Sequence, residues 1–170
     1  GFGGRMFENV ASEIGFVDLG VAPMGIAAGD ADHDGDLDLG LSNADVGRFY
    51  RNDGTELTRI SPILGFFGWG VAWLDAENDG DLDFLMAGSF GNGGGAAHNR
   101  IWRNLGDGVF EDVAPVLNGI SASSRFAVEV DYDNDGLRDW VVLNPGSAMQ
   151  NVSIYQNIST ETGNWIDVHL

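Results

Sequence analysis

Short apolar runs separated by polar, glycine-rich turns recur along the chain and predict β-strands. One set of runs is rich in small residues and stands before Asp-rich loops, at residues 25–29, 70–74 and 126–130. A second set follows the same loops, at residues 37–41, 82–87 and 140–143. No longer segment shows the 3.6-residue apolar period of an amphipathic helix, so we expect an all-β chain.

Two further runs complete each unit. A third strand is expected at residues 48–51, 100–103 and 153–156, each time followed by an asparagine, namely Asn52, Asn104 and Asn157. A fourth strand is expected at residues 57–60, 109–113 and 165–169. Four antiparallel strands in a repeated unit make one blade of a β-propeller. The sequence therefore predicts about three blades, which form part of a larger propeller or assembly.

The repeat also predicts the boundaries of the units. The Asp-rich loops begin 45 and 56 residues apart, which is close to the length of a blade and too long for a solenoid rung. Residues 3–10 echo residues 106–113, so residues 1–10 are expected to be the last strand of a preceding blade. The blades then follow as 11–60 with loop 30–38, 61–113 with loop 75–83, and 114–170 with loop 131–139.

The three loops share one frame, with carboxylates at positions 1, 3, 5 and 9 and glycine at position 6. The candidate metal ligands at positions 1, 3, 5, 7 and 9 are Asp30, Asp32, Asp34, Asp36 and Asp38, then Asp75, Glu77, Asp79, Asp81 and Asp83, then Asp131, Asp133, Asp135, Leu137 and Asp139. Position 7 is expected to offer its backbone carbonyl, because Leu137 has no side-chain oxygen. Glu77 departs from the frame, and its longer side chain is expected to weaken or reshape the second site.

Such a frame suits calcium, a hard cation that takes six to eight oxygen ligands. Position 12, where an EF-hand loop ends in Glu, holds Leu41, Met86 and Val142, so the ninth-position carboxylates must close the site instead. The alternative is a set of Asp-Gly surface turns without a metal, since both residues favour turns. Three copies in register argue against that alternative, and three Ca²⁺ sites are predicted.

The composition limits the classes of partner that the chain can bind. The chain has 26 acidic and 8 basic residues and a net charge of -18, which repels nucleic acid and anionic membranes and attracts cations. Cysteine is absent, so neither disulfides nor thiol chemistry are available. No apolar run reaches the length of about 20 residues that a membrane span needs. No signal peptide is visible and the chain begins without Met, which indicates processing or a fragment of a longer protein.

The phrases Trp69–Asp75, Asp79–Asp83, Arg100–Asn104 and Phe110–Val113 resemble the FG-GAP and VCBS repeats. These repeats form the propellers of integrin α-subunits, and the likeness is closer to cartilage acidic protein and its bacterial relatives. The resemblance implies a secreted or cell-surface protein whose propeller binds proteins or carbohydrates, and it implies no enzymatic activity. Residues 163–170 resemble the opening strand of the small domain that often follows such repeats.

The residues give no separate sign of an enzyme. The chain has three histidines, His33, His98 and His169, and none neighbours a plausible nucleophile. The Gly-rich segment 91–98 is either a recognition loop or a surface excursion without function. An aromatic cluster is either a sugar-stacking surface or packing between blades, and it comprises Phe66, Phe67, Trp69 and Trp73.

We therefore expect a calcium-stabilised, extracellular and non-catalytic module for protein or carbohydrate interaction and adhesion. Two alternatives remain open at this point. The chain is a non-catalytic propeller part of a secreted polysaccharide-degrading enzyme, or it is a self-assembling ring or fibre subunit. In the second case its open blade edges would pair with further copies of itself.

Overall fold

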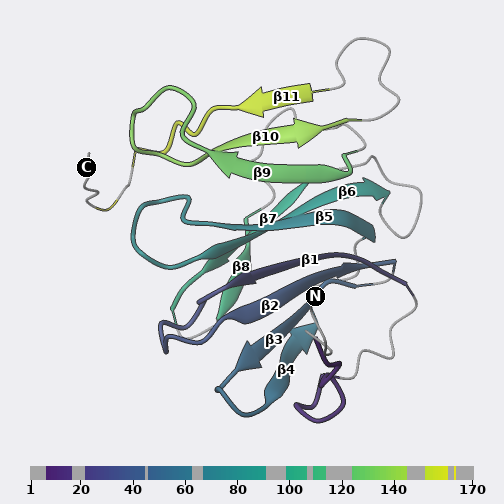
Figure 1. The fold of residues 1–170 in the computed structure, drawn as a ribbon. Helices are drawn as coiled ribbons and strands as arrows, with labels where there is room; N and C mark the ends of the chain where they lie inside the picture. The colour runs from purple at the N-terminus through teal and green to yellow at the C-terminus, as the bar shows by residue number, and fades with distance from the viewer. Residues whose placement is uncertain are drawn as a thin grey trace, which may run out of the picture.

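The chain folds into three separate antiparallel sheets, seen in a computed structural model (Figure 1). The structure describes residues 7–16, 22–44, 46–62, 67–90, 99–106, 109–113, 124–144, 152–160 and 163. Within these ranges every regular element is a strand. The same ranges contain no helix that has the length and hydropathy needed to cross a membrane. The predicted fold class, all-β with blade-like antiparallel sheets, is confirmed.

The sheets follow one another along the chain, and each contains one Asp-rich loop. Sheet 1 has the order β1 (Pro23–Gly29), β2 (Asp38–Asn43), β3 (Arg48–Asn52) and β4 (Leu57–Pro62). Sheet 2 has the order β5 (Phe67–Leu74), β6 (Asp83–Phe90), β7 (Arg100–Asn104) and β8 (Phe110–Asp112). Sheet 3 comprises β9 (Phe126–Val130), β10 (Asp139–Leu143) and β11 (Val152–Tyr155), with β10 in the middle.

Eleven of the twelve predicted blade strands are present, with ends that shift by a few residues. The twelfth, at residues 165–169, lies outside the described residues. The strand expected over residues 1–10 is described only at residues 7–10, which are not in a strand. The boundaries proposed for the blades, and the domain expected after residue 163, stay predictions.

Strand register places the three loops in the same way. In each sheet the ninth-position aspartate pairs with the last residue of the preceding strand. The pairs are Gly29 with Asp38, Leu74 with Asp83, and Val130 with Asp139. Each Asp-rich loop is therefore the connection of an antiparallel hairpin, and its ninth residue already belongs to the second strand.

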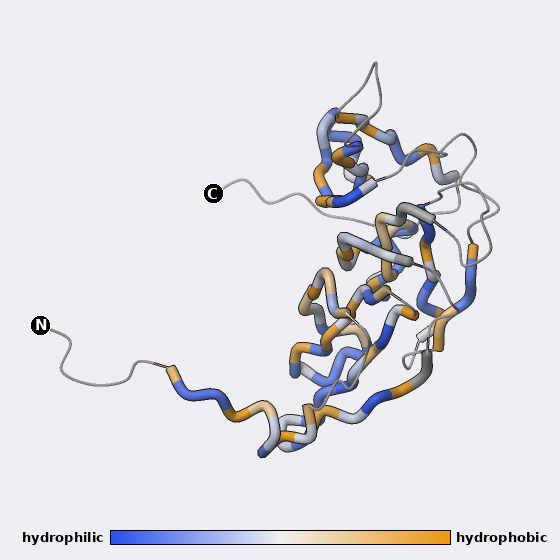
Figure 2. The backbone as a smooth tube through the Cα atoms, turned by 90° about the vertical axis from the view of Figure 1, so that its right-hand side faces the viewer, coloured by the Kyte–Doolittle hydropathy of each residue, from blue (hydrophilic) through white to orange (hydrophobic). Residues whose placement is uncertain are grey.

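The sheets stack on one another with sheet 2 in the middle, so that β5 contacts both β1 and β9 (Figures 1 and 2). Glycine permits this approach of backbone to backbone. A Cβ atom on Gly25 would lie 2.5 Å from the carbonyl oxygen of Trp69, and one on Gly70 would lie 2.6 Å from that of Arg125. The small residues of the first strands thus allow neighbouring sheets to approach closely.

The core between sheets 1 and 2 is aromatic. Phe49 stacks on Phe110 with ring centroids 4.3 Å apart and meets the edge of Phe84 at 4.5 Å. Trp73 is buried in the same cluster, so for this residue packing between sheets is confirmed over a sugar-stacking role. Arg125 lies over the ring of Trp69, 5.0 Å from its centroid. Phe66 and the side chain of Phe67 lie outside the described residues.

The core between sheets 2 and 3 is mainly aliphatic and includes Leu74, Leu85, Ile101 and Val142 around Trp140. Together the two cores hold the three hairpins side by side. Their Asp-rich loops, called loop 1 (30–38), loop 2 (75–83) and loop 3 (131–139), lie along one edge of the stack (Figure 1). The fold therefore brings together three loops that are distant in the sequence.

Candidate metal centres

The ninth-position aspartates anchor each loop. One carboxylate oxygen accepts a hydrogen bond from the backbone N–H of position 2, at 2.9 Å for Asp38, 3.0 Å for Asp83 and 3.0 Å for Asp139. The other accepts one from the backbone N–H of the asparagine at the end of the third strand, at 2.8, 2.8 and 2.7 Å. All three aspartates are buried. Each of these aspartates therefore links the start of its loop to the second strand and to the asparagine that follows the third segment, and these bonds do not require a metal.

The first and fifth positions shape the turn. The N–H of the sixth-position glycine donates to the first aspartate, at 3.2 Å in loop 1 and 3.0 Å in loops 2 and 3. The N–H of position 7 donates to the fifth-position carboxylate at 2.9, 3.0 and 2.9 Å. The glycines have a left-handed φ of 94°, 97° and 87°. A sharp turn that favours glycine is therefore present at position 6 of all three loops.

Position 4 carries a backbone constraint that the loop frame did not predict. His33, Asn78 and Asn134 all have a left-handed backbone, with φ of 61°, 51° and 60°. Asn and His adopt this conformation more readily than most residues with a side chain. The asparagines at two of the three positions were the available signal.

Carboxylates converge in loops 1 and 3. Oxygens of Asp30, Asp32 and Asp38 all lie within 4.8 Å of one another, and so do those of Asp131, Asp133 and Asp139. In loop 1 the Oδ1 atoms of Asp30 and Asp32 are buried without a hydrogen-bond partner. A buried, unpaired carboxylate oxygen is costly unless a cation balances it. The donor set is all oxygen, as calcium requires, so these two loops fit the predicted ion.

The fifth-position residues Asp34 and Asp135 are not members of these triads, and their side chains bond the loop backbone instead. At position 7, Asp81 pairs with His33, while Leu137 contributes its backbone alone. The predicted role of the seventh carbonyl as a ligand stays a prediction. The structure thus brings positions 1, 3 and 9 together in loops 1 and 3, while the ligand role of positions 5 and 7 stays a prediction.

Loop 2 differs in its side chains. Asp75, Glu77 and Asp83 are not among the triads found in the described part of the chain. Glu77 forms a 2.7 Å ion pair with Nε of Arg103, a residue of β7. Burial, together with a hydrogen bond to Glu77, raises the pKa of Asp83 to about 8, against the lowering effect of its bonds from Asn104 and Ala76. Burial also raises the pKa of Asp38 in loop 1.

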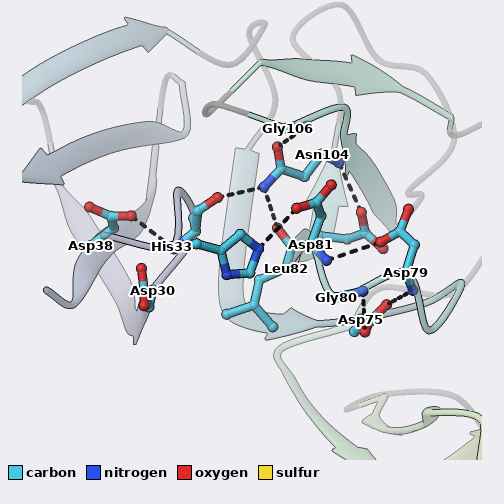
Figure 3. A network of polar contacts seen from close by, with 12 residues as sticks. Asp30, His33, Asp38, Asp75, Asp79, Gly80, Asp81, Leu82, Asn104 and Gly106 are labelled. Atoms are coloured by element: carbon cyan, nitrogen blue, oxygen red, sulfur yellow. Dashed lines mark hydrogen bonds and ion pairs between the residues drawn. The ribbon is translucent and has the colours of Figure 1, made fainter. Parts of the chain in front are cut away.

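The loops contact one another across the sheets (Figure 3). His33 of loop 1 points at Asp81 of loop 2, with Nε2 2.9 Å from Oδ1. Asn78 of loop 2 donates to the carbonyl of Gly136 in loop 3 at 2.8 Å. His33 is therefore a contact between loops, whereas His98 and His169 lie outside the described residues.

The asparagines that end the third strands add a second link. Nδ2 of Asn104 donates to the carbonyl of Ala31 in loop 1 at 2.8 Å, and Nδ2 of Asn157 donates to that of Ala76 in loop 2 at 2.7 Å. The sequence identified these asparagines only as markers of a strand end. In the structure Asn104 connects loop 2 to loop 1, and Asn157 connects loop 3 to loop 2.

Sequence comparison agrees with this architecture. Residues 78–142 match the family model described as FG-GAP-like repeat. The matched segment starts inside loop 2, includes β6 to β9 and loop 3, and ends in β10, which is less than half of the chain. It supports the FG-GAP-type repeat that the sequence predicted. A search of curated proteins gives no match, and the finer resemblance to cartilage acidic protein stays a prediction.

Proposed function

We propose that this chain is a calcium-stabilised module of β-propeller type that binds proteins or carbohydrates and has no catalytic activity. The observation that carries the proposal is the pair of carboxylate triads in loops 1 and 3. The buried, unpartnered oxygens of Asp30 and Asp32 support it most directly. Bound calcium would supply positive charge to oxygens that otherwise repel one another.

The role proposed for the ion is structural. The ligands of loop 1 would be Asp30, Asp32 and Asp38, and those of loop 3 would be Asp131, Asp133 and Asp139. Of these, Asp38 and Asp139 also bond the loop backbone and the asparagine that follows the third strand's tyrosine-containing segment in their own sheet. Because the triads form only in the folded chain, the free energy of calcium binding would add to the free energy of folding.

An extracellular or cell-surface location follows from the expected affinity. Extracellular calcium modules bind with dissociation constants of about 10⁻⁴ to 10⁻³ M. The much lower calcium level of the cytosol would leave such sites largely empty. Adhesion and matrix interactions are the functions that suit this location.

A second candidate, assembly with further sheets, is favoured by the outer face of sheet 3. Phe126 of β9 pairs with Leu143 of β10, and Leu143 pairs with Val152 of β11 on its other side. All three side chains are exposed, Phe126 to 62% and Leu143 to 43%. Val128 and Ile154, further exposed residues, lie on the same face two residues along their strands. An apolar sheet face of this kind suits another sheet, either from the same protein or from a second copy.

Calorimetry tests the calcium proposal. Calcium titrated into chelator-treated protein should give a saturable heat with a dissociation constant of about 10⁻⁴ to 10⁻³ M. Asp32→Asn should weaken binding in loop 1 while keeping the shape of the side chain, and magnesium should bind more weakly because it demands a tighter octahedral site. An absence of calcium-dependent heat, together with melting temperatures that calcium leaves unchanged, would rule the proposal out.

A further inference from the structure

We propose that loop 2 functions without calcium, because the guanidinium group of Arg103 takes the place of the ion. The chain would then bind two calcium ions, in loops 1 and 3, rather than the three predicted from the sequence. This inference rests on the proposed function, since it assumes that calcium binds where the triads form.

The backbone of loop 2 does not explain the difference. Its turn has the same hydrogen bonds as the other two, from Gly80 N–H to Asp75 at 3.0 Å and from Asp81 N–H to Asp79 at 3.0 Å. Its sixth-position glycine has the same left-handed φ of 97°. The absence of a three-carboxylate cluster from loop 2, as the structure describes it, therefore originates in the side chains.

Position 3 is where the side chains diverge. Glu77 is one methylene longer than Asp32 and Asp133, and its carboxylate lies 2.7 Å from Arg103 Nε, in an ion pair whose geometry is not that of a hydrogen bond. The Glu77 side chain is only 21% exposed and that of Arg103 is 43% exposed, so solvent screens the pair only in part. Both residues also line a cavity of about 560 Å³ between sheets 2 and 3. The carboxylate at position 3 is thus already balanced by a cation of the protein.

The remaining carboxylates of loop 2 are also satisfied. Asp75 accepts one hydrogen bond on each oxygen, from the N–H groups of Asp79 and Gly80, both at 3.0 Å. Asp83 likewise accepts one on each oxygen. Among the described residues, the buried and unpartnered carboxylate oxygens belong to Asp30 and Asp32 of loop 1. Loop 2 therefore lacks the unpartnered oxygens of loop 1, and it is also not among the loops with a carboxylate triad in the described residues, which are loops 1 and 3.

The matching positions in the other sheets explain why only loop 2 is affected. In loop 3 the residue equivalent to Arg103 is Gln156, whose neutral amide donates to Asp133 at 2.6 Å and leaves the negative charge unbalanced. In sheet 1 the equivalent residue is Arg51, which is exposed, and the described residues include no ion pair between it and Asp32. A glutamate at position 3 and an arginine at the end of the third strand occur together in sheet 2 alone.

The stoichiometry of calcium binding, measured by calorimetry on chelator-treated protein, tests the inference. The parent protein should bind two ions. The double variant Glu77→Asp with Arg103→Gln gives sheet 2 the residues that sheet 3 has at these two positions, and it should bind three ions. Arg51→Gln is the matched control and should leave the stoichiometry at two.

The reverse exchange provides an independent measurement in case the first variant fails to fold. Asp133→Glu with Gln156→Arg gives loop 3 the residues of loop 2 and should lower the stoichiometry from two to one. A parent that binds three ions, or exchanges that leave the number unchanged, would overturn this inference and leave the proposed function intact. A parent that binds no calcium would instead overturn the proposed function.

Discussion

At the scale of single residues, the carboxylates of one loop have different structural roles. Asp38 is 4% exposed and accepts two backbone hydrogen bonds, from Ala31 and Asn52. Asp34 is exposed and accepts one, from Asp36. Both were predicted as ligands, and of the two Asp38 belongs to the triad of loop 1.

Asp38→Ala should therefore be the more destabilising of the two changes. It leaves two backbone N–H groups without partners, which costs about 1–3 kcal/mol for each buried group, whereas Asp34→Ala should cost about 1 kcal/mol. Urea denaturation in the presence of chelator measures both without any metal contribution. Equal losses for the two variants would contradict the anchoring role of position 9.

Asp83 makes the metal-free protein sensitive to pH. Its pKa is about 8 in the folded chain and 3.8 is the ordinary value, so the folded state holds a proton that the unfolded state releases. The charged groups facing it include Glu77, and Arg103 lies beside that glutamate. The stability that this proton contributes is complete below about pH 4 and is lost as the pH rises through about 8.

In chelator, the free energy of unfolding should consequently decline between about pH 5 and pH 8. Denaturant titrations across that range measure the slope. Asp83→Asn removes the titrating group and should flatten the slope, even though the variant has a lower overall stability. A parent whose stability rises steadily over the same range would show that this carboxyl is ionised in the folded protein.

At the scale of elements, the loops depend on the sheets next to them. Asn104 is 1% exposed and donates both to Leu82 of its own hairpin and to Ala31 of loop 1. Asn52 has the equivalent place in sheet 1 and donates to Leu37 of its own hairpin. The two asparagines differ in one contact, the bond from Asn104 to the preceding sheet, so Asn52 serves as the matched control for that contact.

Asn104→Ala should cost more stability than Asn52→Ala, by about 1–3 kcal/mol, because it also leaves the buried carbonyl of Ala31 without its donor. Thermal or denaturant unfolding of both variants in saturating calcium gives the comparison. Similar losses would mean that the contact between loops contributes nothing to the stability of the stack.

The elements themselves were predictable because their signals are local. Apolar runs, the Asp-Gly frame and the glycine at position 6 act within about ten residues, and they identified eleven strands and three turns. The ion pair between Glu77 and Arg103 was not predictable, since it depends on how β7 pairs with β6. The contact between His33 and Asp81 depends on the packing of two sheets and joins residues 48 positions apart.

At the scale of the whole molecule, we propose that the stack joins a calcium-dependent part to a calcium-independent one. Loops 1 and 3 hold triads of like charge, whereas loop 2 lies between them and is balanced by the chain itself. Each loop also bonds the next, so loss of an ion should weaken the contacts of the neighbouring sheet. The high net charge of -18 makes this dependence stronger, because compaction without cations brings carboxylates together.

The free energy of unfolding, measured against calcium concentration, is the direct test of whether calcium stabilises the fold. A ligand that binds the folded state alone adds about 1.4 kcal/mol per site for each tenfold rise in its concentration above the dissociation constant. The two triads therefore predict a rise of about 2.8 kcal/mol per tenfold increase in calcium once both sites are saturated. A free energy of unfolding that is independent of calcium from chelator to about 10 mM would contradict the account.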